Sequence, residues 1–247
     1  NMFIGRESEL QDLMSLWRKR TSSIIACRGR RRIGKSTLFR EFARRSADVY
    51  MEFEGLAPNP EKPVTNEDQL NEFATRLAKL TNSPILHLQN WQDAFFWLDR
   101  AIDDTKKTLI LLDEISWMAA DAPQFPAVLR NAWESFFHRH EKLILVVCGS
   151  VSAWIKKNIL GNTGFTGRFS RDYVLSELSL RECAMLARMI KNPYKYNPRK
   201  NYYDRQTPEV CEDGADYVLG LMLEQELISQ DEYEGAMADR LQVLETS

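Results

Sequence analysis

The sequence predicts a three-layer α/β fold, in which a parallel sheet of five strands is covered by helices on both faces. Short, fully apolar runs such as 108–112 and 143–148 alternate with longer segments whose apolar residues recur at helical spacing. Strands that are apolar on both faces are typical of parallel sheets buried between helices. A glycine-containing loop, 29–34, joins the first predicted strand to the helix after it, as such folds require. A small helical tail is expected to follow.

Each element follows from its local pattern. Residues 7–18 are expected to form a helix because Leu10, Leu13 and Leu16 fall on one face. The expected strands are 23–27, 49–53, 108–113, 143–149 and 172–175. The other expected helices are 35–45, 68–80, 92–102, 126–138 and 151–157. Proline and polar residues mark 57–65 as a loop, and beyond residue 178 helices alternate with loops to the end.

Composition indicates an ordinary globular protein. The chain has 247 residues, of which 44% are hydrophobic and 28% charged. No apolar run is long enough to span a bilayer, and the first residues show no secretory signal. Four cysteines lie far apart without a CxxC pair: Cys27, Cys148, Cys183 and Cys211. We therefore expect a reduced, cytoplasmic protein with no membrane partner.

Charge is distributed unevenly along the chain. The net charge is −2, yet residues 201–247 carry many acidic and few basic side chains, whereas 1–200 is net basic. A basic body suits polyanions, whether a nucleotide or a nucleic acid. A phosphate-binding loop followed by an acidic, solvated tail would give the same asymmetry. Both interpretations stay open, because charge balance is a weak guide to partners.

A phosphate-binding loop is predicted between the first strand and its helix. The pattern G-x-x-x-x-G-K-[ST], the Walker A motif, is matched by Gly29, Arg30, Arg31, Arg32, Ile33, Gly34, Lys35 and Ser36, with Thr37 following. Its glycines let several backbone N–H groups point at one anion, and the helix N-terminus adds partial positive charge. We expect Lys35 on the β- and γ-phosphates, the Ser36 hydroxyl on Mg²⁺ and Thr37 near the α-phosphate.

The third predicted strand ends in two carboxylates, as a Walker B motif does. The segment 109–114 reads LILLDE, so Asp113 and Glu114 stand at the strand end. Asp113 there can hold Mg²⁺ through its water shell. Glu114 can polarise a water for attack on the γ-phosphate. This pattern is weak alone, since many strands end in acids, but the phosphate loop in the same chain strengthens it.

Two further residues are candidates. Ser150, after the fourth strand, could hydrogen-bond the γ-phosphate or the attacking water. Alternatively it caps the next helix, a role that Ser152 could also take. Arg168 could reach a phosphate as a sensor or as an arginine finger, in the same chain or in a neighbouring copy. Its alternative is an exposed arginine paired with an acid such as Asp172.

The motifs together resemble the archaeal-type ATPase family, an AAA-like branch of the P-loop ATPases close to the signal-transduction (STAND) ATPases. The resemblance covers residues 2–178 and rests on Phe3-Ile4-Gly5-Arg6-Glu7, GRRRIGKST, LILLDE, VVCGS and Gly167-Arg168. It implies the strand order 5-1-4-3-2, a nucleotide contact near Arg6 and Glu114 as the catalytic base. It also implies a domain at 1–178, with 179–247 as a helical segment.

The tail resembles the last helices of the glycosyltransferase module of class A penicillin-binding proteins. The similar stretches are 177–187, 190–193, 196–198, 217–222 and 227–233. The catalytic glutamates of that family have no counterpart here, so no activity is carried over. A natural fusion, a chimeric reading frame and chance similarity all stay open. A fusion would leave the ATPase without its lid.

The sequence therefore predicts Mg²⁺-dependent binding and hydrolysis of ATP by a module that acts as a nucleotide switch. The alternative is a nucleotide-dependent binding module with negligible turnover, assembling on a protein partner or a nucleic acid. A small-molecule kinase would share the phosphate loop, but the DE strand end and Ser150 favour an ATPase. A glycosyltransferase is disfavoured, because it rests on the tail alone.

Overall fold

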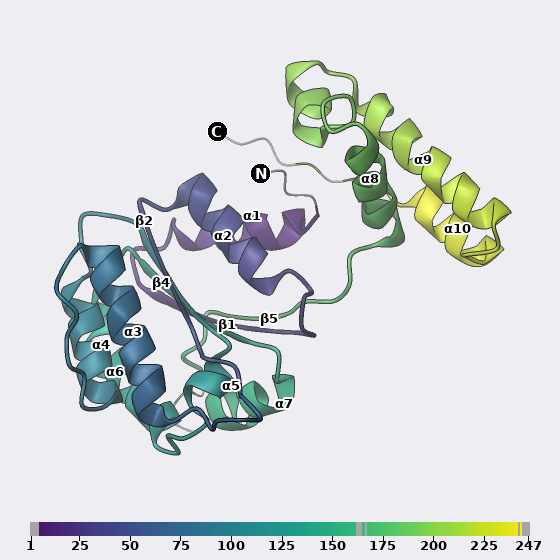
Figure 1. The fold of residues 1–247 in the computed structure, drawn as a ribbon. Helices are drawn as coiled ribbons and strands as arrows, with labels where there is room; N and C mark the ends of the chain where they lie inside the picture. The colour runs from purple at the N-terminus through teal and green to yellow at the C-terminus, as the bar shows by residue number, and fades with distance from the viewer. Residues whose placement is uncertain (1–4, 162–164, 166, 242, 244–247) are drawn as a thin grey trace. The chain divides into compact units, whose positions relative to one another are not determined.

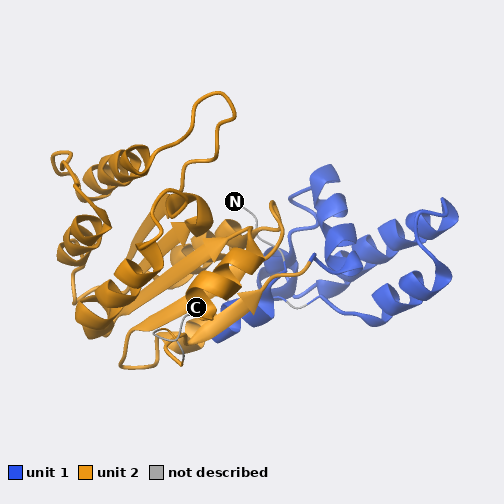
Figure 2. Cartoon of the chain, turned by 90° about the horizontal axis from the view of Figure 1, so that it is seen from below, with its two compact units in different colours: residues 1–12, 177–247 blue, residues 13–176 orange. Residues whose placement is uncertain are grey.

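The computed structural model describes residues 5–161, 165, 167–241 and 243. The chain divides into two compact units, one of residues 13–176 and one of residues 1–12 with 177–247 (Figure 2). The larger unit contains the phosphate loop and every predicted strand.

The larger unit is built on a parallel five-stranded sheet (Figure 1). Its strands are β1 (Ser23–Arg28), β2 (Val49–Glu54), β3 (Thr108–Asp113), β4 (Leu143–Gly149) and β5 (Arg171–Val174). Their order is β2-β3-β4-β1-β5, which confirms the predicted order 5-1-4-3-2 read from the opposite edge. All neighbours run parallel, so every carboxyl end lies at one edge of the sheet. At that edge Glu54 pairs in register with Asp113, and Arg28 with Gly149.

Helices cover both faces of this sheet. The longer ones are α2 (Lys35–Ser46), α3 (Asn66–Thr81), α4 (Trp91–Arg100) and α6 (Phe125–Ser135). Helix α1 (Glu7–Leu16) begins in the smaller unit and ends in the larger one. Figure 1 shows α2 on one face and α3, α4 and α6 on the other. Sequence signals set the starts of two of them: Thr65 and Asp68 form a capping box on α3, and Asn90 accepts from Asp93 N at α4.

The core beneath α3, α4 and α6 is rich in aromatic rings. Phe53 of β2 stacks on Phe73 of α3 with ring centroids 4.2 Å apart. Trp91 meets Phe73 edge-on at 5.6 Å and Phe125 at 4.8 Å. Such pairs add about 0.5–1.5 kcal/mol each beyond the area they bury. Because β3 and β4 are buried along their whole length, this core holds the strand ends that carry the polar groups.

Three short elements differ from the expected pattern. The turn α5 (Ile115–Met118) directly follows β3 and was not expected. The expected helix 126–138 ends at Ser135 and continues as a 3₁₀ turn, Phe137–Arg139. The helix expected at 151–157 is α7 (Ser152–Ile155), which runs into a π-helical turn, Lys156–Leu160. Other boundaries agree within about two residues, the usual fraying of element ends.

A histidine lies between two aspartates at the far end of the sheet, before β4. His140 Nε2 lies 2.7 Å from Asp99 and its Nδ1 2.5 Å from Asp104. Burial lowers the pKa of His140, but the hydrogen bonds to Asp104 and then Asp99 outweigh burial, so the pKa is raised above its ordinary value. The protonated form therefore stabilises the folded unit.

The smaller unit contains the first residues of α1 and, among its described residues beyond 176, the helices α8 (Leu180–Lys191), α9 (Pro208–Glu224) and α10 (Gln230–Ala238), with a π-helical turn at Lys200–Asp204. Arg181 is fully buried among them. It forms ion pairs with Glu212 and with Asp216, the latter at 2.8 Å, and donates to the Ala236 carbonyl at 3.2 Å. Among the described residues, no helix is both long and apolar enough to cross a membrane.

Candidate nucleotide site

The phosphate loop lies between β1 and α2, as predicted. Gly34, directly before α2, has φ 92° and ψ 19°, a left-handed conformation that glycine adopts without strain. Gly29 also has a positive φ, 157°, and in addition it lacks room for a side chain, because a Cβ there would lie 2.7 Å from the Leu175 carbonyl oxygen. The two glycines of the motif therefore differ in the space around them.

Lys35 holds the loop from inside. Its side chain is buried, with 5% of the residue exposed. Its Nζ donates to the carbonyl oxygens of Gly29 at 3.0 Å and Arg30 at 2.8 Å. The loop thus curls around one ammonium group, which adds its charge to that of the helix N-terminus.

The two predicted Mg²⁺ ligands are in direct contact. Ser36 Oγ donates a hydrogen bond to Asp113 Oδ2. The other carboxylate oxygen, Oδ1, accepts from Glu114 N at 2.9 Å. Asp113 is buried, with 5% exposed. A hydroxyl from α2 and a carboxylate from β3 therefore converge on one point.

Glu114 has an unusual backbone and a fixed side chain. Its φ of 47° and ψ of 48° are left-handed, which costs a residue with a side chain about 1–2 kcal/mol. Its Oε2 accepts from Ser150 N at 3.2 Å and Ser150 Oγ at 2.9 Å. Strand β4 thus orients the carboxylate that β3 carries. The alternative of a helix cap is wrong for both serines, because α7 has no side-chain cap bond and Ser152 is its first residue.

A pocket of about 200 Å³ opens beside these groups. It is lined by Arg32, Gly34, Lys35, Ser36, Thr37, Arg40 and Glu114. Of these, Arg40 was missed by the sequence analysis. It stands four residues after Ser36 and so on the same face of α2, a spacing that could have indicated it.

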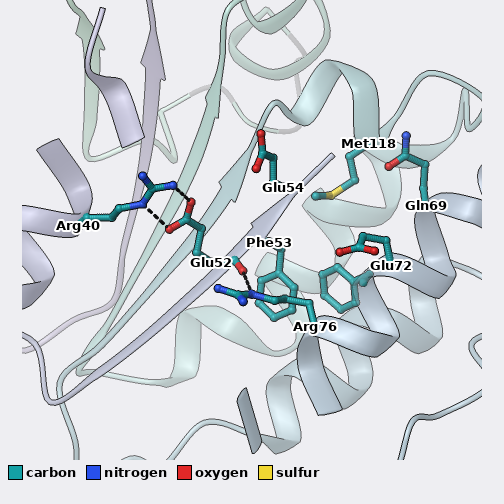
Figure 3. Close-up of a pocket in the computed structure, with 9 residues that line it drawn as sticks. Arg40, Glu52, Phe53, Glu54, Gln69, Glu72, Arg76 and Met118 are labelled. Carbon is teal, nitrogen blue, oxygen red and sulfur yellow. Dashed lines mark hydrogen bonds and ion pairs between the residues drawn. The ribbon is translucent and has the colours of Figure 1, made fainter. Parts of the chain in front are cut away.

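Arg40 also lines a second cavity, of about 360 Å³, between β2, α3 and α5 (Figure 3). There it forms an ion pair with Glu52, whose Oε2 also accepts from Tyr50 OH at 2.7 Å. Burial raises the pKa of Glu52, but the hydrogen bonds from Arg40 and Tyr50 outweigh it and hold the pKa below its usual value. Burial, and then the charge of Asp113, raise the pKa of Glu54. Carboxylates thus crowd the ends of β2 and β3.

The three loop arginines differ in their surroundings, although all are exposed. The Arg31 guanidinium carbon lies 4.8 Å from the centroid of the Trp117 ring on α5, in cation–π contact. Arg32 lines the phosphate pocket and has φ 62°. Trp117 could not be linked to the loop from the sequence, because nothing local joins them.

Arg168 lies against α6 rather than at the pocket. It pairs with Glu134 at 3.4 Å and is more than half exposed. It is not among the described residues that line the phosphate pocket. This agrees with the alternative of an exposed arginine paired with an acid, although the acid is Glu134 and not Asp172, whose two carboxylate oxygens accept from Arg28 at 3.2 and 3.0 Å. In the register of β1 with β5, Asp172 lies opposite Ala26, two residues before Arg28, and the Arg28 side chain reaches back to it.

The N-terminal motif falls partly outside the described residues, which begin at Gly5. Arg6 forms an ion pair with Glu9 at 3.7 Å. It belongs to the smaller unit, so its predicted nucleotide contact stays a prediction. Gly164 and Thr166, which lead to the predicted Gly167-Arg168 pair, also lie outside the described residues.

One family profile covers most of the chain. It describes an ATPase domain predominantly from Archaea and matches residues 3–201. The chain belongs to this ATPase family. The match includes the phosphate loop, the DE strand end and Ser150, so membership confirms the predicted nucleotide-binding ATPase module. A search of the curated proteins gave no match.

Several solved structures share the fold of this ATPase domain. The Aeropyrum pernix ORC2 protein, in ADPNP and ADP complexes, has a TM-score of 0.56 at 13% identity, covering 96% of this chain and 68% of that one. A Walker-type ATPase of Pyrococcus abyssi has a TM-score of 0.52 at 14% identity, and the match covers 91% of this chain and 75% of that one. Cdc6p of Pyrobaculum aerophilum has a TM-score of 0.51 at 15% identity, and the match covers 74% of this chain and 48% of that one. At these identities the likeness shows the fold alone.

Proposed function

We propose that this ATPase domain binds ATP with Mg²⁺ and hydrolyses it, and that the cycle works as a nucleotide switch. The observation that carries the proposal is the bond from Ser36 to Asp113, with Glu114 on the wall of the same pocket. Two oxygen donors that meet beside a buried lysine match what a phosphate-bound metal ion needs.

The donor set fits Mg²⁺ in particular. The described residues include no cluster of three or more His, Cys, Asp or Glu side chains that could hold a metal alone. Mg²⁺ in nucleotide sites commonly takes one or two protein oxygens, and phosphates and water complete its shell. When bound, Mg²⁺ would neutralise charge on the β- and γ-phosphates. The protein would contribute Ser36 and Asp113.

The remaining chemistry is assigned to the protein's own groups. Lys35, inside the loop, supplies positive charge to the phosphates. Glu114 accepts a proton from the attacking water, and Ser150 holds its carboxylate in place through two hydrogen bonds. The short turn after β3 therefore carries the base into the pocket.

Mg²⁺-dependent phosphate release tests the proposal, with nucleotide binding measured in parallel. Lys35→Ala should lose both binding and turnover. Glu114→Gln should bind ATP normally and hydrolyse it at least about 100-fold more slowly, the usual range for losing a general base. Glu61→Gln, in the exposed loop before α3, is the matched control and should change neither. Undiminished turnover in Glu114→Gln would exclude it as the base.

A nucleotide-dependent binding module without turnover is the second candidate. Arg30 and Arg31 are exposed beside the phosphate pocket, where they could meet the backbone of a nucleic acid. DNA binding measured from low to high salt tests this. If Arg30 meets one DNA phosphate, Arg30→Ala should reduce the salt slope by about one. No retention of DNA at low salt would remove the nucleic-acid version.

The exposed Arg168 is proposed as the residue that a protein partner or a second copy would meet. Turnover per molecule that rises with protein concentration in the wild type, but not in Arg168→Ala, would support self-association. The division into an ATPase domain at 1–178 and a helical segment at 179–247 is likewise proposed, and the likeness of that segment to penicillin-binding proteins stays a prediction.

A further inference from the structure

The turn after β3 presents Glu114 in a conformation that glutamate rarely adopts. Its carbonyl oxygen accepts from Trp117 N at 2.8 Å and Met118 N at 3.2 Å, which closes the turn. A left-handed residue with a side chain persists only where the surrounding structure fixes it. The contacts around α5 therefore identify what holds the carboxylate.

The first such contact is the backbone of Gly55, directly after β2. Its N–H donates to the Asp113 carbonyl at 3.0 Å. A Cβ at this position would lie 2.6 Å from Met118 N and 2.7 Å from Glu114 O. Those two atoms form the bond that closes the turn. Any side chain at residue 55 would therefore press on the turn itself.

The second contact is the buried amide of Gln69 on α3, with 5% of the residue exposed. Its Oε1 accepts from Leu56 N at 2.8 Å. Its Nε2 donates to the carbonyls of Leu56 at 3.1 Å and Trp117 at 3.1 Å. Figure 3 shows its side chain next to Met118 at the wall of the second cavity. One side chain thus joins α3, the segment after β2 and the end of α5.

We propose that Gln69 and Gly55 are positioning residues for Glu114. Both residues contact the backbone of the turn that carries the carboxylate. Neither is among the described residues that line the phosphate pocket. This role rests on the proposed function, since it matters for rate only if Glu114 is the base. A reacting group displaced by about 1 Å can lower a rate by about 100-fold.

Two variants and two matched controls test the role. Gln69→Leu keeps the size of the side chain and removes its three hydrogen bonds. Gly55→Ala adds the single methyl that the turn cannot accommodate, and serves if the first variant fails to fold. Gln92→Leu, exposed on α4, and Gly220→Ala, with nothing within 4 Å of the added Cβ, are the controls.

The first measurement is amide hydrogen exchange across residues 114–118, which needs no activity. Both variants should exchange faster there than the wild type, while β4 keeps its protection and the controls match the wild type. Unchanged protection of the turn in both variants would overturn the proposal, whether or not the protein hydrolyses ATP.

The second measurement separates positioning from general loosening. In the wild-type background each variant should lower kcat by about 10- to 100-fold and change KM by less than about threefold. In a Glu114→Gln background the same change should lower the residual turnover by less than about twofold, because the group being positioned is gone. An equal loss in both backgrounds would overturn the role. If the wild type shows no Lys35-dependent turnover, the proposed function fails and the exchange measurement alone decides.

Discussion

The two glycines that bound the phosphate loop should respond in opposite ways to asparagine. Gly34 has a left-handed backbone, and an added Cβ there meets nothing within 4 Å. Gly29 would place its Cβ 2.7 Å from the Leu175 carbonyl. A substitution at Gly34 therefore strains only the backbone, whereas one at Gly29 forces β1 and the end of β5 apart.

The magnitudes follow from these causes. Alanine at Gly34 costs about 1–2 kcal/mol for the left-handed conformation, partly offset by about 0.4–1 kcal/mol of lost freedom in the unfolded chain. We expect a net loss of about 1 kcal/mol, and less for asparagine, which tolerates this region. Alanine at Gly29 overpacks a backbone contact, costing about 1–3 kcal/mol. It also strains the bond from Leu175 N to Arg28 O, worth about 1 kcal/mol. Asparagine there brings no relief.

Urea unfolding followed by tryptophan fluorescence measures these differences. All six tryptophans lie between residues 17 and 154, so the signal reports on the unit of 13–176 alone. Gly220→Ala, in the other unit, should leave the midpoint unchanged. The reasoning is refuted if Gly34→Asn is as destabilising as Gly34→Ala, or if Gly29→Asn is milder than Gly29→Ala.

Three further predictions concern His140, Arg181 and Ser36. His140→Gln should destabilise the larger unit by the full amount below about pH 6.5, the ordinary histidine value, and by less as pH rises through the higher pKa of the folded state. Because the folded pKa is raised, the stabilisation is full at low pH and fades as pH rises through that value; urea midpoints at pH 5.5 and 9 would show a constant difference if this is wrong. Arg181→Met should lower the free energy of unfolding by about 3–5 kcal/mol, because it leaves Glu212 without its buried partner. Adding Glu212→Gln should restore part of that stability, and thermal unfolding followed by circular dichroism measures both variants. Ser36→Ala should weaken ATP binding about tenfold or more in Mg²⁺, while binding in EDTA stays unchanged; an equal loss in both would exclude a metal-ligand role.

The sheet and the centre of the site could be predicted because their signals are local. Fully apolar runs identify strands, and in a parallel sheet their carboxyl ends must meet at one edge. A serine after the phosphate loop and an aspartate after another strand were therefore expected close together, and Ser36 and Asp113 are hydrogen-bonded. Ser150 was expected at the γ-phosphate or its water. Its N–H and hydroxyl donate to Glu114, and its contact with the γ-phosphate or the water stays a prediction.

The groups around this centre could not be predicted, because they depend on packing between distant segments. Nothing in the sequence near Gly55 shows that its backbone packs against Met118 N so closely that an added Cβ would lie 2.6 Å from it. The acid that pairs with Arg168 could not be named for the same reason. Arg168 is an exposed arginine paired with an acid, but the acid is Glu134 of α6, whereas Asp172 of β5 pairs with Arg28 of β1. Gln69 is a polar residue within an amphipathic helix, and only its burial and its hydrogen bonds to Leu56 and Trp117 distinguish it from its exposed neighbours.

Two residues with a strained backbone line the proposed site. Among the described non-glycine residues with positive φ, Asn82 ends α3 and Glu226 follows the end of α9, positions where left-handed residues commonly terminate helices. Arg6 and Gln206 lie shortly before α1 and α9. Arg32 and Glu114 instead line the phosphate pocket. Local preference opposes both, at about 1–3 kcal/mol each. In most of a folded chain each residue adopts a backbone conformation that suits it, and exceptions are expected mainly at functional sites. At Glu114 the competing requirement is the placement of one carboxylate, which Gly55, Gln69 and Ser150 enforce from three separate elements.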